Sequence, residues 1–177
     1  AARPERAAVD LRRLVAGFLR MAPDVAIVGE VRDREALPLL LTLSSGVKGF
    51  TTIHAGSARQ ALSRLRFVCQ LSDNDLPIGA LNSLVTEAID VVVHCARTPA
   101  GPRVTEVIAV EDLSASPDGT AFTVTEVFRR EGVGAELTWT GQIPQRLARP
   151  FRDAGHDIRT ILDDARPSPH LGQVSVP

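Results

Sequence analysis

Two short stretches decide the fold: Val25-Ala-Ile-Val28, which continues into Gly29-Glu-Val-Arg32, and Phe50-Thr-Thr-Ile-His54. The first is a continuous apolar run of strand length, and the second is rich in β-branched residues. Such runs are typical of strands that are buried on both faces of a parallel sheet. Helical spacing over Glu35 to Ser44 predicts a crossover helix between them, so both strands should run in the same direction.

The same alternation continues on both sides of these strands. Helices are predicted over Val9 to Leu19, Ser57 to Leu71 and Pro77 to Ile89, and a third strand over Asp90 to His94. Alternating helices and strands predict an α/β fold with one parallel sheet, which we expect all three strands to join.

The character of the sequence changes after Thr98. Extended segments over Val104 to Asp112 and Ala121 to Phe128 flank a turn at Ser116-Pro-Asp-Gly119 and predict a β-hairpin. A short strand near Leu137 to Trp139 and short helices over Ile143 to Arg152 and Asp157 to Leu162 should follow. We therefore expect three parts: a core at residues 1–97, a hairpin with a helical carboxyl-terminal extension at 98–165, and a flexible tail at 166–177.

Composition excludes several classes of protein. With 44% hydrophobic residues, 23% charged residues and a net charge of -1, the chain has the profile of a soluble globular protein without a field that attracts nucleic acid. Tyrosine is absent and Trp139 is the single tryptophan. The sequence has no stripe of basic residues interleaved with aromatic residues, so we do not expect direct nucleic-acid binding. Cys69 and Cys95 form no metal-binding motif. No apolar run approaches the roughly 20 residues of a transmembrane helix.

Glu30 and His54 are the sharpest candidates for chemistry. Each follows a predicted parallel strand, and the carboxyl edge of such a sheet is where ligands bind. Because neighbouring strands lie about 4.8 Å apart, the two groups should come within roughly 5–10 Å of each other. A helix amino terminus capped by Ser57 and Gln60 should lie beside them and could face a phosphate. The alternative is that Glu30 is a solvated turn residue and His54 an ordinary hydrogen-bonding partner.

These motifs resemble those of a known family. Leu19-Arg-Met-Ala-Pro-Asp24, continuing to Arg32, is similar to the Walker B region of the type II/type IV secretion ATPase superfamily, and Phe50 to Leu65 resembles its histidine box. Within that superfamily the chain looks most like the CpaF-type pilus-assembly ATPases, in which a β-rich segment also follows. The likeness runs from about Val9 to Asp163.

The resemblance implies a partial RecA-like P-loop NTPase core, a parallel sheet with flanking helices, and specific roles for residues at its edge. Glu30 would be the Walker B carboxylate that acts on Mg²⁺ through water and polarises the attacking water, and His54 would sense the terminal phosphate of ATP. Gly29, Arg32, Asp33 and Thr52 are the further residues expected beside the nucleotide. For Arg32 and Asp33 the alternative is a surface ion pair of small worth. The family implies a hexameric ring at the cytoplasmic face of the inner membrane, working with a platform protein of a secretion or pilus machine.

Two departures from the family matter. Gly56 and Ala58 stand where the family usually has asparagine and proline. More importantly, the single lysine, Lys48, lies in Gly46-Val-Lys-Gly49, which has neither the glycine spacing nor the hydroxyl residue of a phosphate-binding loop. The chain alone should therefore be inactive.

The sequence leaves two other functions open. One is a non-catalytic, degenerate paralogue that binds a component of the same machine. The other is a metal-dependent hydrolase that uses Glu30, His54 and His94, although the ligand spacing of known metal motifs is missing.

Overall fold

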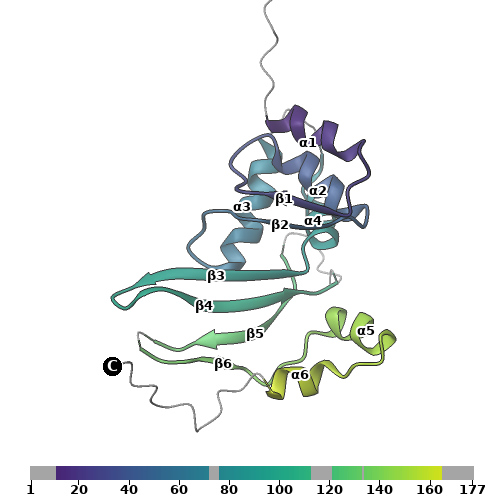
Figure 1. Cartoon of the computed structure of the whole chain (residues 1–177). Helices are drawn as coiled ribbons and strands as arrows, with labels where there is room; N and C mark the ends of the chain where they lie inside the picture. The colour runs from purple at the N-terminus through teal and green to yellow at the C-terminus, as the bar shows by residue number, and fades with distance from the viewer. Residues whose placement is uncertain (1–10, 72–75, 113–120, 133, 165–177) are drawn as a thin grey trace, which may run out of the picture. The chain divides into compact units, whose positions relative to one another are not determined.

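The computed structural model describes residues 11–71, 76–112, 121–132 and 134–164 (Figure 1). Their contacts divide into two compact units, one holding residues up to Gly56 together with Gln60–Ile89, the other holding Ser57–Arg59 and most residues from Asp90 onward. The predicted turn at 116–119 and the predicted tail from residue 166 lie outside the described residues. The predicted domain limits stay a prediction.

The first unit is built on a parallel pair of strands. β1 (Val25–Val28) pairs in parallel with β2 (Lys48–Thr51), and the helix α2 (Ala36–Ser44) connects them, as predicted. β2 begins and ends earlier than the predicted strand over Phe50 to His54, and one face of each strand is exposed, so the expectation of burial on both faces was wrong. α2 packs on β1, on α1 (Leu11–Leu19) and on α4 (Ile78–Ala88). No helix among the described residues has the length and apolar character needed to cross a membrane.

The core of the first unit is apolar and includes residues of all four of its helices. α3 (Ala58–Gln70) contributes one face of its helix, and its Arg66 Nη1 donates a hydrogen bond of 3.0 Å to Asn82 Oδ1 on α4. The buried side chains of the first unit include Val15, Ala26, Val31, Leu39, Leu40, Leu62, Leu65, Val68, Cys69, Leu81 and Val85. Burial raises the pKa of the Cys69 thiol to about 12, so Cys69 serves packing and not chemistry.

Gly49 permits the close approach of α2 and β1 to β2. A Cβ atom at this position would lie 2.4 Å from Leu43 Cδ2 and 2.6 Å from the Ala26 carbonyl oxygen. The second contact is with backbone of the paired strand, since Ala26 is the partner of Gly49 in the ladder. A side chain here would push the two strands and the crossover helix apart.

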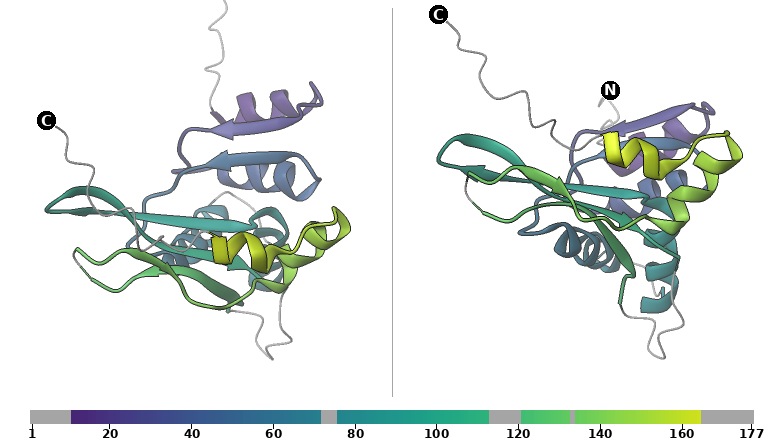
Figure 2. Two further views of the ribbon diagram at one scale, coloured as in Figure 1. Left: turned by 60° about the horizontal axis from the view of Figure 1, so that its bottom comes forward. Right: turned by 90° about the horizontal axis from the view of Figure 1, so that it is seen from below.

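The second unit is an antiparallel sheet in the order β3-β4-β5-β6, formed by Val91–Thr98, Gly101–Val110, Val124–Arg130 and Leu137–Trp139. The predicted pairing of the two hairpin segments is confirmed by β4 and β5, and β6 is the additional strand. α5 (Gln145–Asp153) and α6 (Ile158–Asp164) lie against the sheet (Figure 2). Their contact is apolar and centres on Ala109, Val127, Ala148, Ile158 and Leu162.

The assignment of the third strand to the parallel sheet was wrong. β3 pairs antiparallel with β4, and Thr98 lies opposite Gly101 across a tight turn. Gly101 has φ +96°, a conformation that glycine adopts without strain. Side chains along β3 alternate between exposed and half-buried, which is typical of an antiparallel strand with one face to solvent. The local hairpin therefore prevails over a crossover connection.

We expect Gly49→Ala to destabilise the first unit by about 1–3 kcal/mol, the usual cost of overpacking a close contact. Chemical denaturation followed by circular dichroism measures this change. Gly79→Ala is the matched control, because a Cβ at Gly79 on α4 meets no atom within 4 Å. Equal stability of Gly49→Ala and Gly79→Ala would contradict the close approach.

The isolated chain is expected to self-associate. Neither β1 nor β2 has a second strand neighbour among the described residues, and Ile27 and Phe50, opposite each other, are 73% and 70% exposed. Unpaired edges and exposed apolar sheet faces favour association. Sedimentation velocity should show mass rising with concentration, less so in Ile27→Ser/Phe50→Ser. Clean monomeric behaviour of the unmodified chain at high concentration would contradict this.

Candidate functional site

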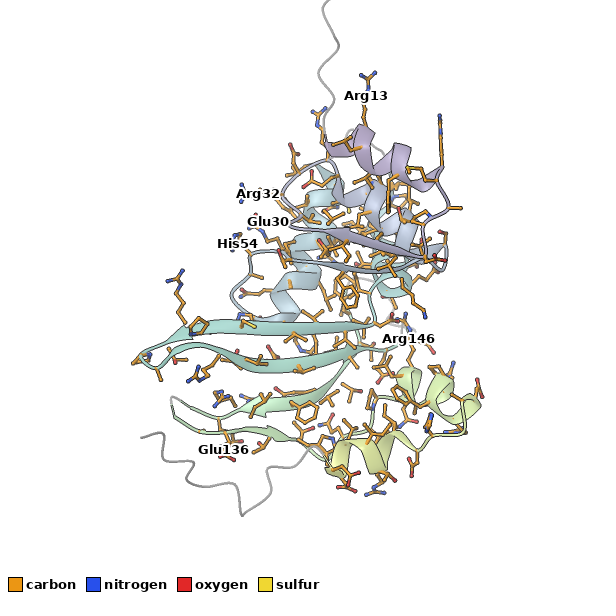
Figure 3. The ribbon with its side chains drawn as sticks, viewed as in Figure 1. Arg13, Glu30, Arg32, His54, Glu136 and Arg146 are labelled. Atoms are coloured by element: carbon orange, nitrogen blue, oxygen red, sulfur yellow. The ribbon has the colours of Figure 1, made fainter. Side chains whose placement is uncertain are left out.

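The parallel pairing of β1 and β2 brings Glu30 and His54 together. Glu30 lies two residues beyond the end of β1 and His54 three residues beyond the end of β2, so both leave the same edge of the sheet. Figure 3 shows the two side chains at this edge, with Arg32 beside them. His54 Nε2 is 2.9 Å from Glu30 Oε1. The carboxylate and the imidazole are therefore in direct contact.

Thr52 fixes the backbone on both sides of Glu30. Its hydroxyl donates a hydrogen bond of 2.5 Å to the Gly29 carbonyl oxygen, and its own carbonyl oxygen accepts the Val31 N–H at 2.8 Å. The Val31 side chain is buried in the core. The predicted residues Gly29 and Thr52 are thus both at the site, where they hold the main chain that carries Glu30.

Arg32 forms an ion pair with the second carboxylate oxygen of Glu30, Oε2. The side chain of Glu30 is 23% exposed, whereas those of Arg32 and His54 are 75% and 85% exposed. Glu30 Oε1 is shielded from solvent and has no aligned hydrogen-bond donor, although the His54 ring nitrogen lies at ion-pair distance. A half-buried carboxylate is thus contacted by two cationic or protonatable groups that face solvent.

These neighbours lower the pKa of Glu30 below its ordinary value. The hydrogen bond from Arg32 is the largest cause; partial desolvation opposes it, and the charges of Arg32 and His54 add to the lowering. The same hydrogen bond raises the pKa of Arg32 further. Glu30 therefore stays ionised at neutral pH. It is better suited to orient a water molecule by accepting a hydrogen bond than to act as a proton donor.

Glu35, directly before α2, is a site residue that the sequence reasoning missed. Its Oε1 accepts the Arg32 N–H at 2.6 Å and the Asp33 N–H at 3.1 Å. The side chain of Asp33, predicted to be near the nucleotide, is exposed, and its carbonyl oxygen accepts the Ala36 N–H at 3.1 Å. An acidic residue just before a helix is a signal in the sequence, but it indicates helix-dipole stabilisation and not this contact.

The amino terminus of α3, which was expected to face a phosphate, is contacted by other side chains of the chain. The Ala58 N–H donates to Glu106 Oε2 at 3.0 Å. Gln60 Oε1 accepts the Gly56 N–H at 3.2 Å, one residue before the predicted cap at Ser57. The missing Cβ of Gly56 leaves room for this amide, because a Cβ there would lie 2.7 Å from Gln60 Oε1. Glu106, on β4, could not be predicted from local sequence.

The site fits a water-mediated metal contact better than direct chelation. Across the residues that the structure describes, no group of three or more His, Cys, Asp or Glu side chains is arranged to hold a metal ion. Glu30 Oε1 is a shielded acceptor oxygen, which suits a hydrogen bond from a metal-bound water. His94 of the proposed hydrolase triad instead has its Nδ1 2.8 Å from Thr105 Oγ1 on the neighbouring strand.

A parallel βαβ unit with a carboxylate and an imidazole at its carboxyl edge, flanked by helices, defines an α/β protein with a partial RecA-like core. Its profile match over residues 4–138 places the chain in the type II/IV secretion system protein family, to which it belongs. The superfamily expected from the two motifs is thereby confirmed.

Individual relatives agree with this family. The chain is 40% identical over 104 residues to the conjugal transfer protein TrbB of Rhizobium radiobacter, covering 58% of this chain and 31% of TrbB. It is 41% identical over 90 residues to the type IV secretion system protein PtlH of Bordetella pertussis, covering 49% and 26%. The crystal structure of the VirB11 ATPase from the Brucella suis type IV secretion system, in complex with sulphate, superposes with a TM-score of 0.54 at 26% identity, covering 63% and 33%. The chain thus spans between about a quarter and a third of the length of these relatives.

The pH dependence of Glu30 tests the charge arrangement. Arg32→Ala should raise the pKa of Glu30 toward its ordinary value, and His54→Ala should raise it less, because Arg32 is the larger cause. Carbon-13 NMR of the Glu30 carboxyl group during a pH titration measures both shifts. Arg20→Ala, at the end of α1, is the control and should leave the titration unchanged.

The lowered pKa of Glu30 determines how the stability of the folded chain changes with pH. The ion pair of Glu30 with Arg32 stabilises the folded state at pH values above the pKa that Glu30 has in the unfolded chain. This contribution is lost as the pH falls through the lower pKa that Glu30 has in the folded state. An unchanged Glu30 titration in Arg32→Ala would contradict the arrangement.

Proposed function

We propose that this chain supplies the carboxyl-terminal portion of the ATP-hydrolysing core of a secretion or pilus-assembly ATPase. The observation that carries the proposal is the 2.9 Å contact between Glu30 Oε1 and His54 Nε2 at the carboxyl edge of two parallel strands. Ligands of open α/β sheets bind at this edge. The family and the structural similarity to the VirB11 ATPase support ATP as the ligand.

In this proposal Glu30 orients the attacking water. Thr52 holds the main chain on both sides of Glu30, and the lowered pKa of Glu30 keeps its carboxylate ionised as a hydrogen-bond acceptor. Mg²⁺ bound with the nucleotide would neutralise charge on the phosphate oxygens. Phosphoryl transfer depends mainly on positioning and charge stabilisation, so the fixed backbone at Glu30 contributes directly to the rate.

His54 senses the terminal phosphate by exchanging partners. Its ring is 85% exposed and contacts one shielded oxygen of Glu30. When a terminal phosphate is present, His54 Nε2 donates to a phosphate oxygen and leaves Glu30 Oε1 to the water. When the phosphate departs, His54 returns to Glu30. Arg32 makes the corresponding exchange at Oε2, and Gly29, Asp33 and Thr52 shape the nucleotide side of the loop.

We infer that Lys48 does not belong to a phosphate-binding loop. Lys48 is the first residue of β2, opposite Val25, whereas Glu30 and His54 follow the carboxyl ends of the strands. A strand of four residues spans roughly 13 Å, so Lys48 starts at the far end of the sheet from the site. The single lysine is therefore separated from Glu30 by the length of the strand.

The proposal includes the assembly. We infer a hexameric ring at the cytoplasmic face of the inner membrane that works with a platform protein, as for the superfamily. We assign the machine from the branch of the superfamily. A β-rich segment follows the core, as in CpaF-type pilus-assembly ATPases, so our specific proposal is assembly of a Flp-type pilus. Disruption of the gene should then abolish pili; loss of conjugal transfer with pili intact would favour the TrbB-like function instead.

A second candidate is a non-catalytic paralogue that binds a component of the same machine. It is favoured by one observation, the lack of a phosphate-binding loop sequence in these residues. A reading frame that encodes such a loop upstream of Ala1 favours the enzyme. A start codon near Ala1 favours the binding partner.

Turnover measurements test the enzymatic proposal in two steps. The purified chain should hydrolyse no ATP in the presence of Mg²⁺, and turnover that persists through purification and disappears on Glu30→Gln would overturn this. In a chimera in which this chain replaces the matching residues of TrbB, Glu30→Gln should lower kcat by about 10²–10³-fold while ATP binding is retained.

Glu87→Gln, on the exposed side of α4, is the matched control in the chimera and should leave kcat unchanged. If the Glu30→Gln chimera hydrolyses ATP as fast as the unmodified chimera, Glu30 is not the carboxylate that orients the water. An assembled chimera that binds ATP but never hydrolyses it would favour the non-catalytic candidate.

A further inference from the structure

The loop between β1 and α2 is held at two places. Near β1, Thr52 fixes the main chain on both sides of Glu30. Beyond Val31, the side chains of Arg32 and Asp33 are exposed and give the loop no packing of their own. What holds this second half of the loop decides whether the Arg32 guanidinium can stay at Glu30.

Glu35 provides that second anchor. Its side chain is 6% exposed, and one carboxylate oxygen accepts both the Arg32 N–H, at 2.6 Å, and the Asp33 N–H, at 3.1 Å. Hydrogen bonds from backbone N–H groups to a carboxylate are strengthened by its charge. Because burial of a carboxylate is unfavourable unless it is hydrogen-bonded, these two contacts account for the position of Glu35 in the core.

Helix capping does not explain the same contacts. Glu35 stands at the cap position of α2, but its side chain makes no hydrogen bond to the first turn of that helix. It turns back toward the loop instead. The Asp33 carbonyl oxygen accepts the Ala36 N–H at 3.1 Å. The turn from Arg32 to Ala36 is therefore closed by this backbone hydrogen bond as well as by the Glu35 side chain.

A fixed main chain matters because the Arg32 side chain is long and exposed. Exposed ion pairs usually contribute little, since holding long side chains in one geometry costs conformational entropy. The anchor at Glu35 removes the main-chain part of that cost. The negative charge of Glu35 also acts on the Arg32 guanidinium and raises its pKa slightly further.

We propose that Glu35 is a positioning residue whose buried carboxylate holds the Arg32 and Asp33 amides, and thereby keeps the Arg32 guanidinium at Glu30. The catalytic meaning of this contact rests on the proposed function. The positioning itself does not, because it concerns groups of this chain alone and is measurable without nucleotide.

A pH titration of the unmodified chain by NMR is the first test. The amide proton shifts of Arg32 and Asp33 should change with the same midpoint as the side-chain carboxyl carbon of Glu35. Amide shifts that do not follow Glu35 would overturn the proposal. This measurement needs no substitution, so it decides the question even if a variant fails to fold.

Substitution of Glu35 is the second test, read out at Glu30. In Glu35→Ala the pKa of Glu30 should rise toward its ordinary value, because Arg32 is no longer held beside it. In Glu35→Gln, whose amide oxygen still accepts N–H groups, most of the lowering should remain. Glu87→Gln is the control. A folded Glu35→Ala chain in which Glu30 titrates as in the unmodified chain would contradict the proposal, since a purely structural role of Glu35 would give this result.

The same variants separate the two proposals in the TrbB chimera. Glu35→Ala should lower kcat about tenfold or more with ATP affinity nearly unchanged, because misplacement of a catalytic group acts on the chemical step. If the Glu30 titration responds to Glu35→Ala but Glu30→Gln leaves turnover intact, the positioning stands and the proposed function fails. If the titration does not respond while Glu30→Gln abolishes turnover, the reverse holds.

Discussion

The parallel pairing of β1 with β2 is the constraint on which the candidate site depends. Because parallel strands end at the same edge, two residues far apart in sequence, Glu30 and His54, leave the sheet side by side. The pairing requires close packing, and Gly49 allows it by leaving space for Leu43 and for the Ala26 carbonyl oxygen. Gly49, near the amino end of β2, thus permits the strand pairing that brings Glu30 and His54 together beyond the carboxyl end.

The site combines a hydrogen-bonded main chain with exposed charged or protonatable side chains. Thr52 and Glu35 fix the loop through backbone groups, whereas the side chains of Arg32 and His54 are mostly exposed. Glu30, between them, is the least exposed of the three. Such an arrangement can exchange the partners of a carboxylate without moving the carboxylate itself. It is physically suited to a site that must respond to the arrival and loss of a phosphate.

Sequence patterns predicted the parallel strand pair and its crossover helix, because periodicity locates such elements. The proximity of Glu30 and His54 followed because parallel strands end at the same edge of a sheet. The assignment of β3 failed because an apolar run such as Val91–Val93 does not distinguish parallel from antiparallel pairing. Glu35 and Glu106 were missed because side-chain contacts to backbone amides leave no periodic signal. Glu106 reaches Ala58, 48 residues away in sequence, which only the tertiary structure reveals.

The central claim is that the Glu30 carboxylate and the His54 imidazole meet at one edge of the β1–β2 pair. Nuclear Overhauser spectroscopy of the labelled chain tests it most directly. The account predicts cross-peaks between the His54 ring protons next to Nε2 and the side-chain methylene protons of Glu30. A folded chain with assigned signals for both residues and no such cross-peaks would contradict it.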